Sequence, residues 1–164
     1  MNKILKHFHQ QAFFQEIDRK LKKNENIRFT DVPFEMRILL TTYIEQYTEQ
    51  PLLIVTPNIY QAQKVYDDLS RFLGDQLLFF PQDEFITTEM LAMSREFKLE
   101  RIHTIQKIIE DKRPVIVTNT TGYLKKILPK EAWVNASIHL HKDQELKQDT
   151  LLKKLIYLGY ERVD

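Results

Sequence analysis

Three short runs of largely apolar residues divide the chain, and each lies between turn-forming or polar residues. These runs are 52–55, 77–80 and 115–118. Unbroken apolar runs of this length are typical of strands that are buried on both faces of a parallel sheet. The alternating segment 27–30 (Ile-Arg-Phe-Thr) predicts one further, shorter strand ahead of them.

The stretches between these runs have the spacing of amphipathic helices. Asn58 can cap the helix that follows the strand at 52–55, and a strand that turns directly into a helix is half of a βαβ unit. The pattern therefore predicts an α/β fold with a parallel sheet and flanking helices. Apolar residues three and four positions apart predict helices over 3–23, 36–47, 59–72, 95–110, 123–128 and 146–158.

From Pro129 onward the pattern changes. Residues 136–141 alternate between apolar and polar, as in a strand with one face in water. After the helix at 146–158, residues 160–164 have the character of a strand that has just begun. We therefore expect a domain boundary within 127–134 and only the start of a second domain after it. The expected organisation is an N-terminal helix (1–24), an α/β domain (25–128) and the start of a small α+β domain (129–164).

Composition excludes several classes of function. Lys and Arg number 24 against 23 Asp and Glu, a formal net charge of +1, so no overall field favours nucleic acid or a membrane surface. The absence of cysteine excludes disulfides and thiolate chemistry. Neither a signal-peptide pattern nor a membrane-length apolar run is present, so the cytoplasm is the expected location.

The loop before the second helix is the position at which a nucleotide hydrolase would carry its phosphate-binding loop. That loop needs glycines, a lysine and a hydroxyl side chain. Asp31 would instead place a negative charge beside the phosphate, and Ile38 offers no hydroxyl to a metal ion. Only Arg37 keeps a positive charge near the lysine position. We predict a plain connector without a cofactor, and the residues of this degenerate loop are Asp31, Phe34, Glu35, Met36, Arg37 and Ile38.

Two other groups of residues have the types that metal sites use, but neither forms a complete set. Asp83 and Glu84 follow the strand at 77–80, where a carboxylate pair could bind magnesium or transfer protons. No further ligand accompanies them in the sequence. His139 and His141 share the exposed face of a predicted strand and lack a third ligand. The sequence therefore predicts neither a catalytic residue nor a metal site.

Six segments carry a family resemblance through their order and spacing. They are 53–69, 79–84, 95–101, 115–118, 124–129 and 158–164. Together they resemble the amino-terminal region of bacterial transcription-repair coupling factors (Mfd). That region is similar to UvrB, the damage-recognition subunit of the nucleotide excision repair nuclease. The resemblance extends over most of the chain from about residue 25.

The resemblance implies a RecA-like domain, called 1a, followed by the start of domain 2, which docks UvrA. In this family the amino-terminal module has lost its ATPase motifs. Here Asp31, Phe34, Glu35 and Met36 occupy even the places of its vestigial glycine-serine pattern. The implied function is a non-catalytic adaptor that recruits UvrA to stalled RNA polymerase. Polymerase and double-stranded DNA would be bound by other domains of the full-length ATP-dependent translocase, one of which could mask domain 2.

Docking of UvrA in this family is polar and uses arginines of domain 2. The element Tyr160-Glu161-Arg162 matches the related UvrB pattern, so the resemblance implies that Arg162 and Tyr160 contact UvrA. An arginine suits this role because its planar fork can bond a carboxylate twice. Two other functions stay open. One is the nucleotide-binding half of an active helicase or ATPase, and the other is direct DNA binding through the basic cluster at 19–23.

Overall fold

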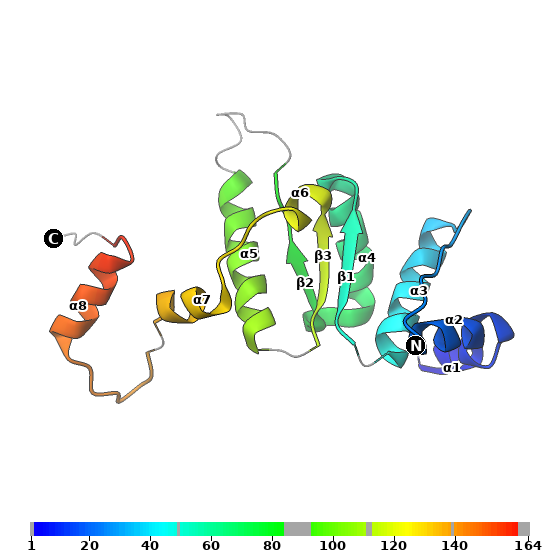
Figure 1. Ribbon diagram of the computed structural model, residues 1–164, viewed down its shortest axis with the longest axis horizontal. Coiled ribbons are helices and arrows are strands. Elements are labelled where there is room, and N and C mark those ends of the chain that lie inside the picture. The colour runs from blue at the N-terminus through cyan, green and yellow to red at the C-terminus, as the bar shows by residue number, and fades with distance from the viewer. Residues whose placement is uncertain (1, 49, 84–92, 111–112, 139, 161–164) are drawn as a thin grey trace. The chain divides into compact units, whose positions relative to one another are not determined.

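The computed structural model describes residues 2–48, 50–83, 93–110, 113–138 and 140–160 (Figure 1). The chain divides into two compact units, Met1–Lys125 and Lys126–Asp164. Assignment of these units to domain 1a and the start of domain 2 stays a prediction. Within the described residues, no helix is long and apolar enough to cross a membrane.

The first unit contains a parallel sheet of three strands. They are β1 (Leu52–Thr56), β2 (Leu77–Phe80) and β3 (Val115–Asn119), in the order β1-β3-β2. Leu52 and Leu77 both align with Val115, so β3 pairs with a neighbour on each side. The prediction of a parallel α/β sheet from the three apolar runs is confirmed.

Helices α4 (Ile59–Leu73) and α5 (Met93–Glu110) follow β1 and β2. Figure 1 shows α4 lying along one face of the sheet. Ala62 and Leu69 of α4 are fully buried against β3 residues such as Val117. The predicted cap is confirmed, since the Asn58 side chain accepts a hydrogen bond of 2.8 Å from the N–H of Gln61. A short 3₁₀ turn, η1 (Gly74–Gln76), separates α4 from β2.

Helices α1 (Asn2–His9), α2 (Ala12–Lys22) and α3 (Phe34–Tyr47) form a second apolar cluster. The prediction of one helix over 3–23 is wrong, because the chain turns at Gln10 and Gln11 before α2 begins. The turn shifts the helical phase. Phe14 is therefore buried at 3% exposure, whereas Phe13, which a single helix would place inside, is 54% exposed.

Two predictions about strands in the first unit are wrong. Residues 27–30 form no strand and lead as irregular chain into α3. Strand β1 is not buried on both faces, since Leu53 and Val55 are 51% and 44% exposed. Helix α4 covers only the face that carries Leu52 and Ile54. The apolar run located the strand correctly but could not show how many of its faces are covered.

The second unit contains α7 (Lys130–Ala136) and α8 (Gln148–Tyr157). The strand predicted at 136–141 is wrong for its described residues, while His139 lies outside them. Helix α7 occupies residues up to 136, and the hydroxyl of Ser137 then donates to the carbonyl of Trp133. Lys154 of α8 donates to the carbonyl of Ser137 at 2.8 Å.

The helix predicted at 123–128 is also misplaced, since α6 is Thr120–Tyr123.

Candidate functional site

The degenerate loop residues lie at the start of α3. Helix α3 begins at Phe34 with Pro33 at its N-cap, and no side chain caps it. Asp31 has a φ of 54°, in the left-handed region. Because no strand precedes this loop, the expected strand-to-helix crossover at 31–38 is absent. The residues instead form the corner through which the irregular segment enters α3.

A groove of about 460 Å³ lies beside this corner, between α3, the carboxyl end of β1 and the first turns of α4. Its volume is within the range of ligand pockets. Three of the degenerate loop residues line it, namely Phe34, Arg37 and Ile38. The remaining lining residues come from α3, β1, the turn after β1 and α4, and are Thr41, Ile54, Val55, Thr56, Pro57, Tyr60, Gln61, Lys64 and Val65.

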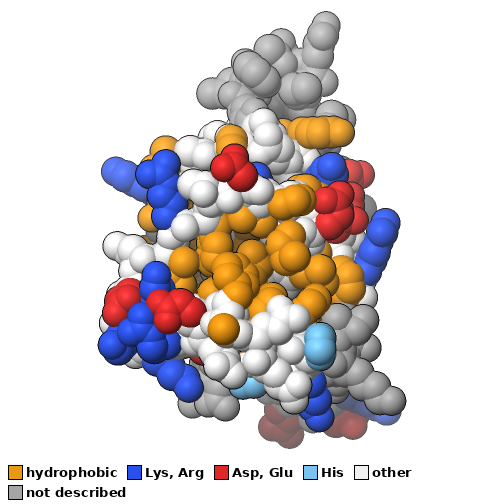
Figure 2. Space-filling view, turned by 90° about the vertical axis from the view of Figure 1, so that its right-hand side faces the viewer, with side chains coloured by type: hydrophobic (Ala, Val, Ile, Leu, Met, Phe, Trp, Pro, Cys, Tyr) orange, Lys and Arg blue, Asp and Glu red, His pale blue; other side chains and the backbone are white. Residues whose placement is uncertain are grey.

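The space-filling view shows the face of the first unit that carries the N-terminal helices (Figure 2). Figure 2 views the molecule from the side on which Figure 1 draws α2 and α3. Hydrophobic side chains gather at the centre of this face, and charged side chains lie around them. Such an arrangement of an apolar centre and a polar rim is typical of surfaces that bind other molecules.

The electrostatic character of the groove comes from two cations. Arg37 donates from Nε to the carbonyl of Val32 at 2.9 Å, which leaves its terminal amino groups for other acceptors. The Nζ of Lys64 lies 4.3 Å from the centre of the Phe34 ring. Within the described residues neither cation has a carboxylate partner, and no acidic side chain lines the groove. The groove therefore favours a negatively charged group.

Tyr60 and Lys64 are groove residues that the sequence did not single out. They lie four residues apart on α4, together with Gln61 and Val65, and so occupy one face of that helix. The spacing of apolar residues in α4 predicted the buried side of the helix correctly, but it carried no information about the contacts of the polar side. Finding the site requires knowing that α3 packs beside α4, which no local pattern shows.

Polar side chains at the carboxyl end of the sheet are occupied in holding the loops together. The Thr118 hydroxyl donates to the carbonyl of Phe80 at 2.6 Å, and Asn119 exchanges hydrogen bonds with the backbone of Gln82. A Cβ added at Gly122 would collide with the Thr118 hydroxyl. Glycine is therefore required at this close approach, and these residues are structural.

The carboxylate pair predicted after β2 can be located only in part. Asp83 is described, whereas Glu84 lies outside the described residues. Burial lowers the pKa of Arg101 on α5, and the nearby charge of Asp83 partly offsets that effect. Arg101 donates to the carbonyl of Pro81 at 3.0 Å. Across the part of the chain that is described, no three metal-ligating side chains come together.

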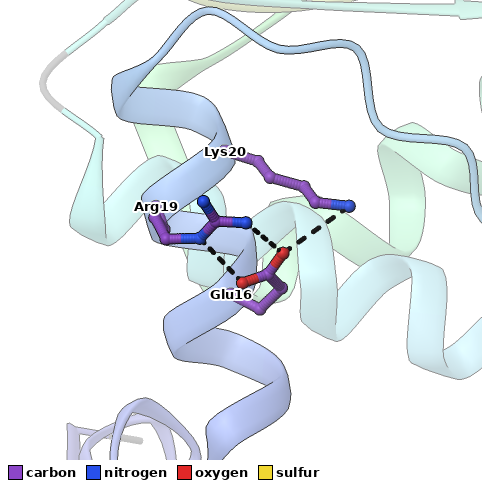
Figure 3. A network of polar contacts seen from close by, with 3 residues as sticks. All are labelled: Glu16, Arg19 and Lys20. Carbon is purple, nitrogen blue, oxygen red and sulfur yellow. Dashed lines mark hydrogen bonds and ion pairs between the residues drawn. The ribbon is translucent and has the colours of Figure 1, made fainter.

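The basic end of α2 is partly neutralised by an acid on the same helix. Arg19 binds Glu16 through two hydrogen bonds of 2.8 and 2.6 Å, and Lys20 lies 3.7 Å from the same carboxylate (Figure 3). The hydrogen bond from Arg19 lowers the pKa of Glu16. Two of the cations in the cluster at 19–23 therefore already have a partner, which weakens the case for a DNA-binding surface.

The expected partner contacts lie at the end of the second unit. Tyr160 is 64% exposed, and Arg162 lies outside the described residues. Gly159 ends α8 with a φ of 86° and donates to the carbonyl of Ile156, while the N–H of Tyr160 bonds to Leu155. This pair of bonds is a Schellman cap, which fixes the backbone of Tyr160 against the helix.

Comparison with known proteins gives one consistent set of relatives. The transcription-repair-coupling factor of Bacillus subtilis is 30% identical over 78% of the chain, and that of Staphylococcus aureus (strain USA300) is 31% identical over 75%. The same factor of Staphylococcus epidermidis is 26% identical over 91%. The chain spans only 11–13% of the length of these relatives and matches their N-terminal region. No protein-family model and no solved structure matches.

Proposed function

This chain belongs to the transcription-repair-coupling factor family, and we propose that it is a non-catalytic adaptor module that recruits UvrA to stalled RNA polymerase. The observation that carries the proposal is the match to the N-terminal region of these factors over three quarters of the chain. The module would act in transcription-coupled nucleotide excision repair in the cytoplasm. Binding of polymerase and DNA belongs in this proposal to other domains of a longer protein.

The RecA-like assignment of the first unit is part of this proposal. Support comes from three parallel strands whose order, β1-β3-β2, requires crossover connections, and from α4 and α5 following β1 and β2. Open α/β sheets place ligands at the carboxyl ends of their strands. The groove beside β1 lies at that end.

The chemistry of the groove supports a non-catalytic module. A nucleotide hydrolase uses backbone N–H groups of a glycine loop and an acidic or hydroxyl ligand for magnesium. The α3 corner begins with Pro33, which has no N–H, and Phe34, whose ring lies under Lys64. Among the residues that the structure describes, no glycine or carboxylate lines the groove. These substitutions remove the main elements of triphosphate binding.

The alternative is the nucleotide-binding half of an active helicase. One observation favours it, namely that Arg37 and Lys64 place two cations at the carboxyl end of the sheet. Calorimetric titration of the chain with ATP and magnesium separates the two proposals. The adaptor predicts no binding tighter than about 1 mM. A tighter interaction that weakens in Arg37→Ala would establish the alternative.

UvrA docking is assigned in this proposal to the second unit, through Tyr160 and Arg162. Loss of a buried arginine partner typically costs about 2 to 5 kcal/mol, and less at the rim of an interface. The test is capture of purified UvrA by a protein that contains complete domain 2, with Arg162→Glu as the variant. Lys107→Glu on α5 is the control for the same charge change. Equal UvrA capture by wild type and Arg162→Glu would remove Arg162 from the interface.

A further inference from the structure

The proposed UvrA-docking element, residues 160–162, leaves α8 through a turn that few residue types can adopt. Gly159 has a φ of 86°, in the left-handed region that side chains disfavour. A Cβ added at Gly159 would meet no described atom within 4 Å. A side chain at this position is therefore disfavoured by the backbone conformation and not by crowding.

The turn fixes where the docking element begins. The N–H of Gly159 donates to the carbonyl of Ile156, and the N–H of Tyr160 donates to the carbonyl of Leu155, each at 3.0 Å. Both acceptors belong to the last turn of α8. Because the second bond holds the backbone of Tyr160 against the helix, the docking element starts in a defined direction relative to α8.

A separate contact holds α8 in place within the second unit. The Nζ of Lys154 donates to the carbonyl of Ser137 at 2.8 Å, across 17 residues of chain. Ser137 is the C-cap of α7, and its hydroxyl and N–H donate to the carbonyls of Trp133 and Val134 at 2.9 and 3.2 Å. Since Ser137 is itself fixed on α7, the bond from Lys154 fixes α8 relative to α7.

The neighbouring lysine does not share this role. Lys154 is partly buried, whereas Lys153 is exposed. Within the described residues no hydrogen bond or ion pair of the Lys153 side chain is found, while Lys154 binds Ser137. The two residues carry the same charge on adjacent positions of one helix, so they form a matched pair for a test.

We infer that Gly159 and Lys154 are positioning residues for UvrA docking. Gly159 sets the direction in which the docking element leaves α8, and Lys154 holds α8 on α7. Neither touches UvrA, and both act through Tyr160 and Arg162. This role rests on the proposed function, because it takes those two residues as the contacts. All the bonds that support it lie between Trp133 and Tyr160 and involve no residue that follows.

Two other roles have to be separated from this one. If Gly159 and Lys154 serve only the folding of the second unit, their substitution weakens UvrA binding to the same degree whether or not Tyr160 is present. If the turn instead positions Tyr160 for a later part of a longer protein, disrupting the turn leaves UvrA binding unchanged or strengthens it. Positioning for UvrA predicts weaker binding that depends on Tyr160.

The main measurement is the Kd of purified UvrA for a protein that contains complete domain 2, by surface plasmon resonance. Gly159→Val is expected to weaken binding at least about tenfold, because a β-branched residue is strained at this φ. Asparagine tolerates the left-handed region, so Gly159→Asn should stay within about threefold of wild type. Lys154→Met should weaken binding about three- to tenfold and Lys153→Met less than about twofold.

A double variant distinguishes positioning from a general structural role. With Tyr160→Ala already present, Gly159→Val should weaken UvrA binding less than about threefold further, because the two changes remove the same contact. An equal loss with and without Tyr160→Ala would overturn the inference. So would binding to Gly159→Val that is unchanged or stronger than wild type, or a loss in Gly159→Asn as large as that in Gly159→Val.

Amide hydrogen exchange of the 164-residue chain tests the turn without UvrA. Exchange at Tyr160 should be at least about tenfold faster in Gly159→Val and near wild type in Gly159→Asn, and unchanged exchange in both would overturn the inference. If Arg162→Glu weakens UvrA binding and Gly159→Val does not, the docking proposal stands and positioning fails. If the turn opens as expected but substitutions at 160 and 162 leave UvrA binding unchanged, the proposed function fails and the positioning role falls with it.

Discussion

Helix α3 is packed in opposite ways on its two sides. Toward α1 and α2 it is sealed, since the Tyr43 ring is fully buried, lies tilted against Phe14 at a ring distance of 4.7 Å and stacks on Tyr47 at 4.6 Å. Toward β1 and α4 it borders an open groove, in which Phe34 stays only partly buried. The comparison separates residues that hold the unit together from residues that are available to bind.

The sealed side also satisfies its buried polar groups. The Tyr43 hydroxyl donates to Asp18 at 2.9 Å, and Nδ1 of His9 lies 2.7 Å from that hydroxyl and 3.1 Å from the carboxylate. These residues come from α1, α2 and α3, so one small network joins all three helices. On the groove side, Arg37 and Lys64 have no comparable carboxylate among the described residues.

The largest predicted effect comes from breaking the sealed side. Phe14→Ala should lower the free energy of unfolding by about 3–5 kcal/mol, because it empties a ring-sized space at a residue that is 3% exposed. Tyr60→Ala, at a groove residue that is 77% exposed, should change it by less than about 0.5 kcal/mol. Chemical denaturation of both variants measures the contrast, and equal losses would contradict it.

The sequence predicted the strands of the sheet better than it predicted which side of α3 is sealed and which side borders the groove. Strands β1, β2 and β3 follow from apolar runs because burial imposes that pattern locally. Tyr43 shows the limit of such reasoning, since its helical spacing indicated burial but not its partners 25 and 34 residues away. The part of His9 in the network could not be predicted either, because it depends on the turn between α1 and α2.

The groove was partly predictable for a related reason. The sequence located Phe34, Arg37 and Ile38 as residues of a degenerate loop, and they do line a pocket. The reasoning assumed a preceding strand at 27–30, which the structure does not contain. Lys64 could not be found because a lysine on the polar side of a helix gives no local signal of its neighbours.

The second effect concerns the hydrogen bonds of the sealed side. Tyr43→Phe should cost about 1–3 kcal/mol, since it leaves the carboxylate of Asp18, 15% exposed, without its buried donor. Tyr66→Phe on α4 is the matched control, because no hydrogen bond to the Tyr66 hydroxyl is found within the described residues. Comparable losses in the two variants would show that the network contributes little.

A pH dependence follows from the same residue. Burial, reinforced by the hydrogen bond to Asp18, raises the pKa of Tyr43 well above its ordinary value near 10. A raised folded pKa means that its contribution to stability is complete below about pH 10 and is lost as the pH rises toward the folded pKa. Between pH 9 and 11 the wild type should therefore lose more stability than Tyr43→Phe. Parallel pH profiles would contradict the assignment.

The smallest predicted effect lies on the open side. Lys64→Ala removes a cation that lies 4.3 Å from the centre of the Phe34 ring, and at an exposed site such a contact is worth about 0.5–1 kcal/mol. Lys107→Ala on α5 removes an exposed ion pair of 3.7 Å with Glu110 and should cost no more than about 0.5 kcal/mol. Denaturation curves measure this difference when both variants keep the wild-type m-value, the slope of the unfolding free energy against denaturant concentration. A decrease of more than about 2 kcal/mol in the free energy of unfolding of Lys64→Ala would mean that the groove is part of the folded core. Both sides of α3 would then stabilise the fold, and the comparison between them would fail.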